Sequence, residues 1–469
     1  MVFSSLIFLF AYLPAVLLIY FVAPRKGKNL ALFLVSFFFY AWGEPIYVLL
    51  MIASLSLAYL FGVGIGKWRQ KKPRIAKALT TLSVCVSLSF LFFFKYYNFF
   101  ASNLSRLPMV NVPAIAGLAL PIGISFYTFQ IISYTVDVWR GDCVAQKNYI
   151  SFGAYVTLFP QLIAGPIVRY TEIDEQLTSR RENVEDFARG VLRFVVGLSK
   201  KVLIGDALAS GYVYFRDSMS VQPTVTGAWM VVILYSVHLY YDFSGYSDMA
   251  IGLGKMFGFS FPENFNYPYV SRSITEFWRR WHISLSSWFR EYVYIPLGGN
   301  RVGILKRYRN LAIVWLLTGF WHGADWNFML WGVYFALILI LERAFLLKIL
   351  ENAPRAIGHI YSLFLIGVGF LIFSHSDLGA AFSTFLALFG VWTSGVWTPT
   401  ALYTVIRLLP LILVSAIGAT PLPKRLWERF QMRHTRWQTA TVIGCLILFC
   451  VCVAYLVDST FSPFEYTQF

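Results

Sequence analysis

Long apolar segments recur along almost the whole chain and constrain its fold more than any other feature. A transmembrane helix needs about 20 predominantly apolar residues. The apolar segments lie at residues 1–23, 29–66, 78–94, 113–137, 148–168, 226–241, 311–341, 357–373, 377–393, 400–418 and 439–457. They predict an all-α polytopic membrane protein with about 11 transmembrane helices by the same length rule. Residues 1–23 have no positive n-region and no small-residue cleavage site, so we expect a first span there and not a signal peptide.

Composition excludes the main soluble classes. Charged residues make up 13% of the 469 residues, whereas soluble globular proteins carry about 25%. This is too little polar material to cover a water-facing surface, so we exclude an ordinary soluble enzyme, a disordered protein and a nucleic-acid binder. The formal net charge of +16 is explained by basic cytoplasmic loops.

Three basic runs indicate the orientation in the membrane. They lie at Arg25–Lys28, at Lys67–Lys77 and at Lys424–Arg436, and basic runs of this kind favour the cytoplasmic side. Residues 29–66 are long enough for two crossings, with a break near Gly43-Glu44-Pro45. The pattern therefore predicts that both chain termini lie outside the cytoplasm.

The middle of the chain is richer in charge. Residues 170–200 and 260–310 are too broken to span, and residues 271–309 alternate arginines and lysines with tryptophans and tyrosines. Such segments tend to lie at the cytoplasmic interface. An interfacial helix that only anchors the bundle is the simplest interpretation, and a binding surface is the alternative.

The six histidines narrow the search for a reaction centre. His322 stands between two strongly apolar stretches and is flanked by Gly319 and Gly323. An ionisable residue at membrane depth indicates a functional site, and burial keeps an imidazole neutral and able to accept a proton. The context of His322 therefore predicts that this residue acts as a general base. A histidine that only forms a helix-packing hydrogen bond is an equally weighted alternative.

A second histidine, His282, follows Arg279 and Arg280 in the sequence Trp278-Arg279-Arg280-Trp281-His282. Two adjacent arginines can bind the phosphates of a donor. A solvated interfacial face is the alternative for this segment.

Two further residues, His238 and Asp242, are four positions apart, which places them on one face of a helix. We expect a buried structural pair there, with an aspartate-oriented histidine as the alternative. The remaining histidines, His359, His375 and His434, lie near predicted helix ends or in a basic loop. No CxxC occurs among the five cysteines, so we expect no disulfide framework and no metal site.

Several long motifs occur in order along the chain. They are Met1-Val2-Phe3-Ser4-Ser5, Pro121-Ile122-Gly123-Ile124-Ser125-Phe126-Tyr127, Leu162-Ile163-Ala164-Gly165-Pro166, the run from Tyr241 to Gly254, the run from Ser273 to Ser286, Leu297-Gly298-Gly299-Asn300-Arg301 and Trp321-His322-Gly323-Ala324. Together they resemble the membrane-bound O-acyltransferase (MBOAT) family, and more narrowly its bacterial alginate O-acetylase (AlgI-type) branch. The resemblance covers residues 1 to about 345.

The resemblance implies a fold and an activity. It implies one membrane-embedded acyltransferase domain over residues 1–469, with core motifs at about 115–345 and C-terminal helices at 357–457, and a ring of transmembrane helices with re-entrant and interfacial helices around a central tunnel. The implied location is the bacterial plasma membrane. The family's embedded catalytic histidine corresponds to His322, and its second, cytoplasm-facing histidine corresponds to His282.

The implied reaction moves an acetyl group from a cytoplasmic thioester, acetyl-CoA, to an extracytoplasmic partner of the SGNH-hydrolase type that acetylates a secreted polysaccharide such as alginate. No bound cofactor is expected. Arg279 and Arg280 would hold the donor phosphates, while Asp325 and Trp321 would orient His322, and Asn327 is a weaker candidate for that role. The sequence leaves open whether His322 is a general base or forms an acyl-imidazole.

Three other functions stay open at this point. The chemistry could be D-alanyl transfer to a cell-envelope polymer from a carrier protein. The chain could also be a transporter without acyl chemistry, or a scaffold that recruits the extracytoplasmic partner.

Overall fold

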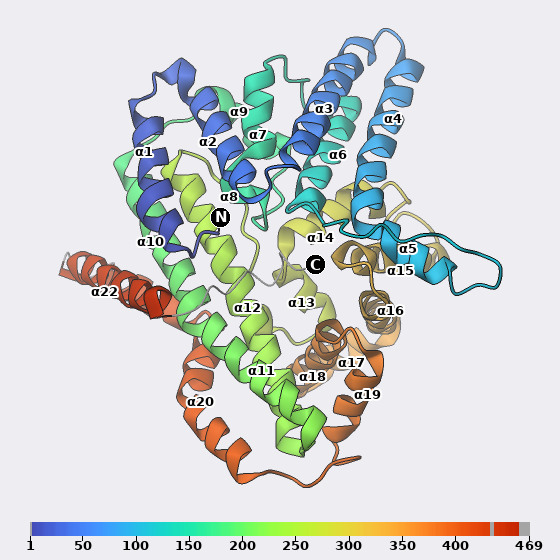
Figure 1. Cartoon of the computed structure of the whole chain (residues 1–469), viewed down its shortest axis with the longest axis vertical. Helices are drawn as coiled ribbons and strands as arrows, with labels where there is room; N and C mark the ends of the chain where they lie inside the picture. Colours follow the sequence, from blue (N-terminus) through green and yellow to red (C-terminus); the bar gives the residue numbers. More distant parts are fainter. Residues whose placement is uncertain (1, 432–435, 459–469) are drawn as a thin grey trace. The chain divides into compact units, whose positions relative to one another are not determined.

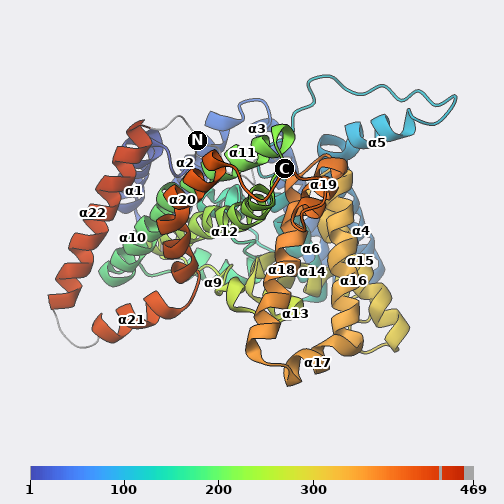
Figure 2. The same cartoon turned by 90° about the horizontal axis from the view of Figure 1, so that it is seen from below.

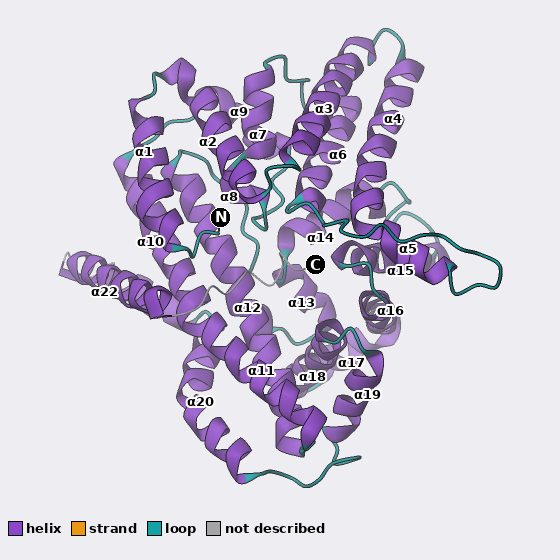
Figure 3. Cartoon of the chain, viewed as in Figure 1, coloured by secondary structure: helices purple, strands orange, loops and turns teal. Residues whose placement is uncertain are grey.

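The computed structural model describes residues 2–431 and 436–458, which form helices and loops without a strand in these ranges (Figure 3). Arg433 and His434 lie outside the described residues. The described residues form two compact units, one of residues 2–194 and 247–262 and the other of residues 195–246, 263–431 and 436–458. Helices α10 (Val184–Ser199) and α12 (Val225–Met256) contain residues of both units.

The first unit holds the N-terminal helices, coloured from blue through cyan to teal-green in Figure 1. Its elements are η1 (Phe8–Tyr12), α1 (Leu13–Val22), η2 (Arg25–Gly27), α2 (Lys28–Gly43), α3 (Val48–Trp68), α4 (Pro73–Leu91), η3 (Phe92–Tyr96), α5 (Tyr97–Leu104), α6 (Ile124–Arg140), α7 (Tyr149–Thr157), α8 (Phe159–Leu162) and α9 (Tyr170–Ser179). An aromatic cluster of Phe8, Tyr12, Phe39 and Phe159 forms part of its core, with ring centroids 5.4–6.3 Å apart. Aromatic pairs at this separation add to the stability that burial provides.

The second unit holds the segments that carry the predicted site. Its elements are η4 (Lys200–Gly205), α11 (Asp206–Val221), η5 (Pro268–Val270), α13 (Ile274–Arg280), α14 (Ile283–Phe289), η6 (Arg290–Tyr294), α15 (Ile304–His322), α16 (Trp326–Leu341), η7 (Glu342–Leu346), α17 (Leu347–Asn352), α18 (Arg355–Ser374), α19 (Leu378–Ala387), α20 (Pro399–Gly418), α21 (Leu422–Gln431) and α22 (Arg436–Asp458). Helix α16 packs against both α15 and α18 (Figure 2).

Two glycines allow α15 and α16 to approach closely. A Cβ atom on Gly332 would lie 2.6 Å from the Trp315 carbonyl oxygen, and one on Gly319 would collide with the Phe328 carbonyl oxygen. Small residues at a helix contact permit this backbone approach in membrane proteins. The contact places the C-terminal end of α15, which carries His322, against the first turns of α16.

Five helices are long and apolar enough to cross a membrane, judged by length and composition within the described residues. They are Val48–Trp68, Pro73–Leu104, Arg355–Ser374, Pro399–Gly418 and Thr439–Asp458. The all-helical polytopic fold is confirmed, and the count of about 11 spans is not. Several predicted segments are shorter or interrupted: residues 113–123 precede α6 as a loop, and residues 148–168 break at Leu158 between α7 and α8.

The break between α2 and α3 at Gly43-Glu44-Pro45 occurs where the sequence predicts it. Segments 170–200 and 260–303 form helices of 3 to 16 residues separated by turns, as their broken hydropathy indicates, and the 19-residue α15 begins at Ile304. The single domain over residues 1–469 stays a prediction.

Candidate active site

His322 is the last residue of α15, and it is 5% exposed. Three aromatic rings surround its imidazole: Trp321 and Trp331 at 5.0 Å and Phe373 at 5.2 Å between ring centroids, all nearly edge-on. Trp331 comes from α16 and Phe373 from α18, so three helices form this aromatic box. The neutral form of an imidazole is the one that accepts a proton.

The first turn of α16 fixes the box. Asn327 donates a hydrogen bond from Nδ2 to the Phe373 carbonyl oxygen at 3.0 Å, which ties α16 to the end of α18. Asp325 is the N-cap of α16, where its Oδ1 accepts a hydrogen bond from the Trp326 amide at 2.7 Å. The structure thus assigns Asp325 a capping contact. Its orientation of His322 stays a prediction.

His282 is the N-cap of α14 and is held in the left-handed backbone region, with φ of 47° and ψ of 55°. The conformation is uncommon for a residue other than glycine. Its Nδ1 lies 3.1 Å from Oδ1 of Asn264, and the same oxygen accepts hydrogen bonds from the Ser284 amide at 3.2 Å and from the Ser284 hydroxyl at 2.9 Å. A further bond joins the Ile283 amide to the Asn264 carbonyl oxygen at 3.0 Å.

These contacts define the protonation of His282. Because the Ser284 amide can only donate, the Asn264 atom that it meets is the oxygen, and His282 must donate to that oxygen through Nδ1–H. In the neutral ring Nε2 then carries the lone pair. His282 lies between two short helices, outside the candidate spans, and burial lowers its pKa to about 3. His282 is therefore a neutral imidazole at physiological pH, with the lone pair on Nε2.

The ring of Trp321 packs against both His322 and His282. Its ring centroid lies 5.0 Å from that of His322 and 6.1 Å from that of His282. The structure thus brings together three of the residues selected from the sequence. Trp321 is itself 5% exposed, so both imidazoles pack against a buried aromatic side chain.

The two arginines before His282 differ in their surroundings. Arg280 forms an ion pair with Glu276 at 2.9 Å and also donates to the Asn266 carbonyl oxygen at 3.1 Å. Arg279 is exposed and has no ion pair within the described residues. Arg279 is therefore the one of the two whose guanidinium can meet an anionic group without breaking a contact.

His238 and Asp242 both lie in α12 and are almost fully buried. Asp242 forms an ion pair with Lys201 at 3.1 Å, and Lys201 pairs also with Asp206 at 2.5 Å. His238 places Nδ1 2.9 Å from the Gly205 carbonyl oxygen. The structure thus adds Lys201 of the π-turn η4 as the charged partner of Asp242.

We expect Asp242→Asn to lower the free energy of unfolding by about 3 kcal/mol, the lower end of the range for broken buried ion pairs, because Asp206 still neutralises Lys201. Unfolding of the detergent-solubilised protein by denaturant measures this. The matched control is Asp217→Asn, which removes the exposed pair with Arg216 and should change stability by under about 1 kcal/mol. Equal effects of the two changes would contradict the assignment.

The sequence analysis did not select Asn264 or Lys201, which contact the candidate residues His282 and Asp242. Lys201 stands in a mostly apolar stretch, and the rule that an ionisable residue among apolar neighbours has a partner or a function would have selected it. Asn264 lies in a loop without a recognisable pattern, and only the fold brings it to His282.

His359 and His375 contact the carbonyl oxygens of Ser271 and Leu371.

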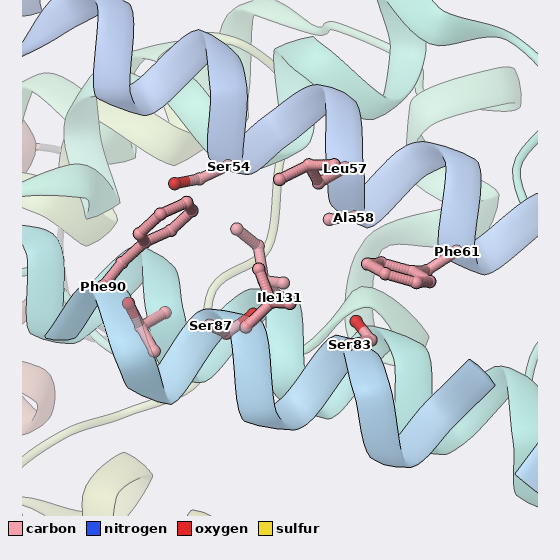
Figure 4. A pocket seen from close by; sticks show the side chains of 10 residues that line it. Ser54, Leu57, Ala58, Phe61, Ser83, Ser87, Phe90 and Ile131 are labelled. Carbon is pink, nitrogen blue, oxygen red and sulfur yellow. The ribbon is translucent and has the colours of Figure 1, made fainter. Parts of the chain in front are cut away.

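A small pocket lies elsewhere, between α3, α4 and α6 of the first unit (Figure 4). Its lining residues are Ser54, Leu57, Ala58, Phe61, Ser83, Val86, Ser87, Phe90, Thr128 and Ile131. None of the residues selected from the sequence lines it. The candidate site is thus the cluster around Trp321 and not this pocket.

The family model for membrane-bound O-acyltransferases matches residues 37–356, which is more than half of the chain. The chain belongs to this family. The matched range includes His282, His322 and the helices α15 and α16, whereas Phe373 of α18 lies beyond it. This acyltransferase is therefore an enzyme and a multi-pass membrane protein, as the sequence predicts.

The names of curated relatives of this acyltransferase mention alginate, peptidoglycan and teichoic acid. The probable alginate O-acetylase AlgI of Azotobacter vinelandii is 39% identical over the full length of both chains. The peptidoglycan O-acetyltransferase of Helicobacter pylori is 35% identical over 83% of this chain and 80% of its own. The teichoic acid D-alanyltransferase of Bacillus subtilis is 29% identical over 48% of this chain and 59% of its own.

Proposed function

We propose that this acyltransferase transfers acetyl groups from acetyl-CoA for the O-acetylation of a secreted polysaccharide such as alginate. The observation that carries the proposal is the pair of buried histidines that share contact with Trp321. The names of the full-length relatives support acetyl as the group and alginate as the acceptor class.

In the proposed reaction His322 acts as a general base. It takes the proton from an acceptor hydroxyl, whose oxygen attacks the carbonyl carbon of the thioester. The new carbon–oxygen bond forms as the carbon–sulfur bond breaks, and the proton passes to the departing thiolate to give free coenzyme A. The aromatic box around the buried His322 would limit the access of water and so protect the thioester from hydrolysis.

His282 and the exposed arginine before it would serve the donor. The guanidinium of Arg279 would bind a donor phosphate, and the neutral His282 would lie beside the thioester end of the pantetheine arm. We place this surface at the cytoplasmic face, because the segment 271–309 combines basic and aromatic residues. The enzyme would then reside in the bacterial plasma membrane with both termini outside the cytoplasm.

We expect Arg279→Ala to raise the KM for acetyl-CoA about tenfold with little change in kcat, since a charge-assisted phosphate contact contributes to binding before and during the reaction. Initial rates in inside-out membrane vesicles measure both constants. The control is Arg425→Ala, which removes an exposed cation of α21. An unchanged KM for Arg279→Ala would show that another surface binds the donor phosphates.

The acceptor side would require a second protein. The donor is cytoplasmic and the polymer is secreted, so we propose that the acetyl group passes to an extracytoplasmic partner of the SGNH-hydrolase type, which acetylates the polymer. Co-purification of the full chain with the exported protein, followed by mass spectrometry for an acetylated serine on that protein, tests this step.

The donor is tested by supplying inside-out vesicles with acetyl-CoA labelled in the acetyl group. Label in the glycan fraction supports the proposal. Label that enters only when a D-alanyl carrier protein replaces acetyl-CoA would favour D-alanyl transfer, the activity named for the Bacillus subtilis relative. Solute flux without label in any acceptor would favour a transporter.

A further inference from the structure

Glu342 is a fully buried carboxylate at the point where α16 passes into the π-turn η7. Its Oε1 accepts a hydrogen bond from the Ile274 amide at 2.7 Å. Its Oε2 accepts bonds from the Thr275 amide at 2.8 Å and from the Thr275 hydroxyl at 2.6 Å. The carboxylate thus receives three short bonds from two consecutive residues.

These two residues are the first of α13. The first amides of a helix have no partner within the helix and carry partial positive charge. A carboxylate that accepts from both satisfies them and stabilises the start of the helix. Ser273 caps the same helix through the Glu276 amide, so a local cap is already present and Glu342 adds a long-range one.

The other end of α13 carries the donor-facing residues. Arg279 and Arg280 are its last residues, and His282 follows two positions later. Trp278, in the middle, packs on Trp315 of α15 at 4.7 Å and on Phe335 of α16 at 4.9 Å. The short helix is therefore fixed at its start by Glu342 and along its side by Trp278, and both contacts lead to the α15–α16 pair that carries His322.

The next residue, Arg343, contacts a different motif. Its guanidinium donates to the Tyr294 hydroxyl at 3.1 Å and to Oδ1 of Asn300 at 2.6 Å. Tyr294 ends η6, and Asn300 follows the two glycines of the Leu297–Arg301 motif. Glu342 and Arg343, which are adjacent in η7, thus contact the start of α13 and the Leu297–Arg301 motif. These two segments belong to separate motifs of the family resemblance. Single π-helical turns within α-helices are frequent at functional sites.

We propose that Glu342 is a positioning residue for donor binding, which holds α13 so that Arg279 and His282 meet the thioester donor. The inference rests on the proposed function. It adds a residue that touches neither donor nor acceptor and acts through the start of α13. Arg343 supports the neighbouring Leu297–Arg301 loop from the same turn.

The test compares Glu342→Gln with Glu351→Gln, the same change at an exposed glutamate of α17. Glutamine keeps the length of the side chain but turns one acceptor into a donor that faces a backbone amide. We expect Glu342→Gln to raise the KM for acetyl-CoA at least about tenfold, with a smaller fall in kcat, per amount of folded protein in inside-out vesicles. Glu351→Gln should change neither constant.

Thr275 gives a second pair of variants if Glu342→Gln does not fold. Thr275→Val removes one of the three bonds at nearly constant shape, and Thr275→Ser keeps the hydroxyl donor. We expect a rise in KM for Thr275→Val that Thr275→Ser largely avoids. A positioning role is overturned if folded Glu342→Gln has the KM of the wild type, or if the valine and serine variants have equal KM values. Wild-type vesicles that do not use acetyl-CoA would instead overturn the proposed function.

Discussion

Replacement of His322 by alanine is expected to abolish acyl transfer while the protein still reaches the membrane in normal amounts. Removal of a general base costs about 10²–10⁴-fold in rate. The rings of Trp321, Trp331 and Phe373 pack around His322. None of these three side chains can take over its role as proton acceptor. Initial rates of label transfer from acetyl-CoA, divided by the membrane level of each variant, measure the loss.

A matched pair separates chemistry from packing at this position. His322→Gln keeps a polar side chain of similar volume and should be as inactive as alanine. His359→Gln makes the same change at a half-buried histidine of α18 whose contact is a backbone carbonyl, and it should retain activity. Activity close to wild type in a folded His322→Gln enzyme would remove His322 from the reaction.

The second large effect is expected at His282. His282→Ala loses the hydrogen bond to Asn264 and the lone pair of Nε2, while alanine keeps the left-handed backbone strain that the histidine already carries. We expect a loss of at least about tenfold in acyl transfer. His282→Asn is the informative partner, because asparagine tolerates this conformation and retains a donor. Equal loss in both variants assigns the effect to the imidazole, whereas full activity of His282→Asn would reduce His282 to a structural cap.

The pH dependence of stability gives a second readout for His282. Burial lowers the pKa of the folded-state imidazole to about 3, whereas an unfolded histidine titrates near about 6.5. Between these values the unfolded chain binds more protons than the folded one. The contribution of His282 to stability is therefore complete above about pH 6.5 and is lost as the pH falls toward 3. Thermal unfolding at pH 7.5 and pH 5 should show a larger loss for the wild type than for His282→Asn.

Local sequence was enough to select the two histidines as candidates, and the structure places both beside Trp321. His322 interrupts a strongly apolar stretch, and His282 follows arginines that alternate with tryptophans. Both contrasts can be recognised from the sequence alone. Trp321 was selected because it precedes His322. Its simultaneous contact with His282, 39 residues earlier in the chain, depends on how α13, α14 and α15 pack, and no local pattern contains that information.

The residues that hold the site were harder to predict. Glu342 and Asn264 act on backbone amides and on a ring nitrogen far away in sequence, so neither has a partner at helical spacing. Asp242 illustrates the same limit, since its i−4 neighbour His238 suggested a pair while the ion-pair partner is Lys201 in a preceding element. The number of spans was uncertain for a related reason: π-turns and short helices divide apolar segments that hydropathy treats as continuous.

The most direct test of the proposed activity is the O-acetyl content of secreted glycans from a strain that lacks this gene, before and after complementation with the wild-type gene. The account predicts that acetyl esters disappear from one glycan on deletion and return on complementation, and that glycan then names the acceptor. Unchanged acetylation of every secreted glycan, in a strain without a second enzyme of the family, would contradict the account.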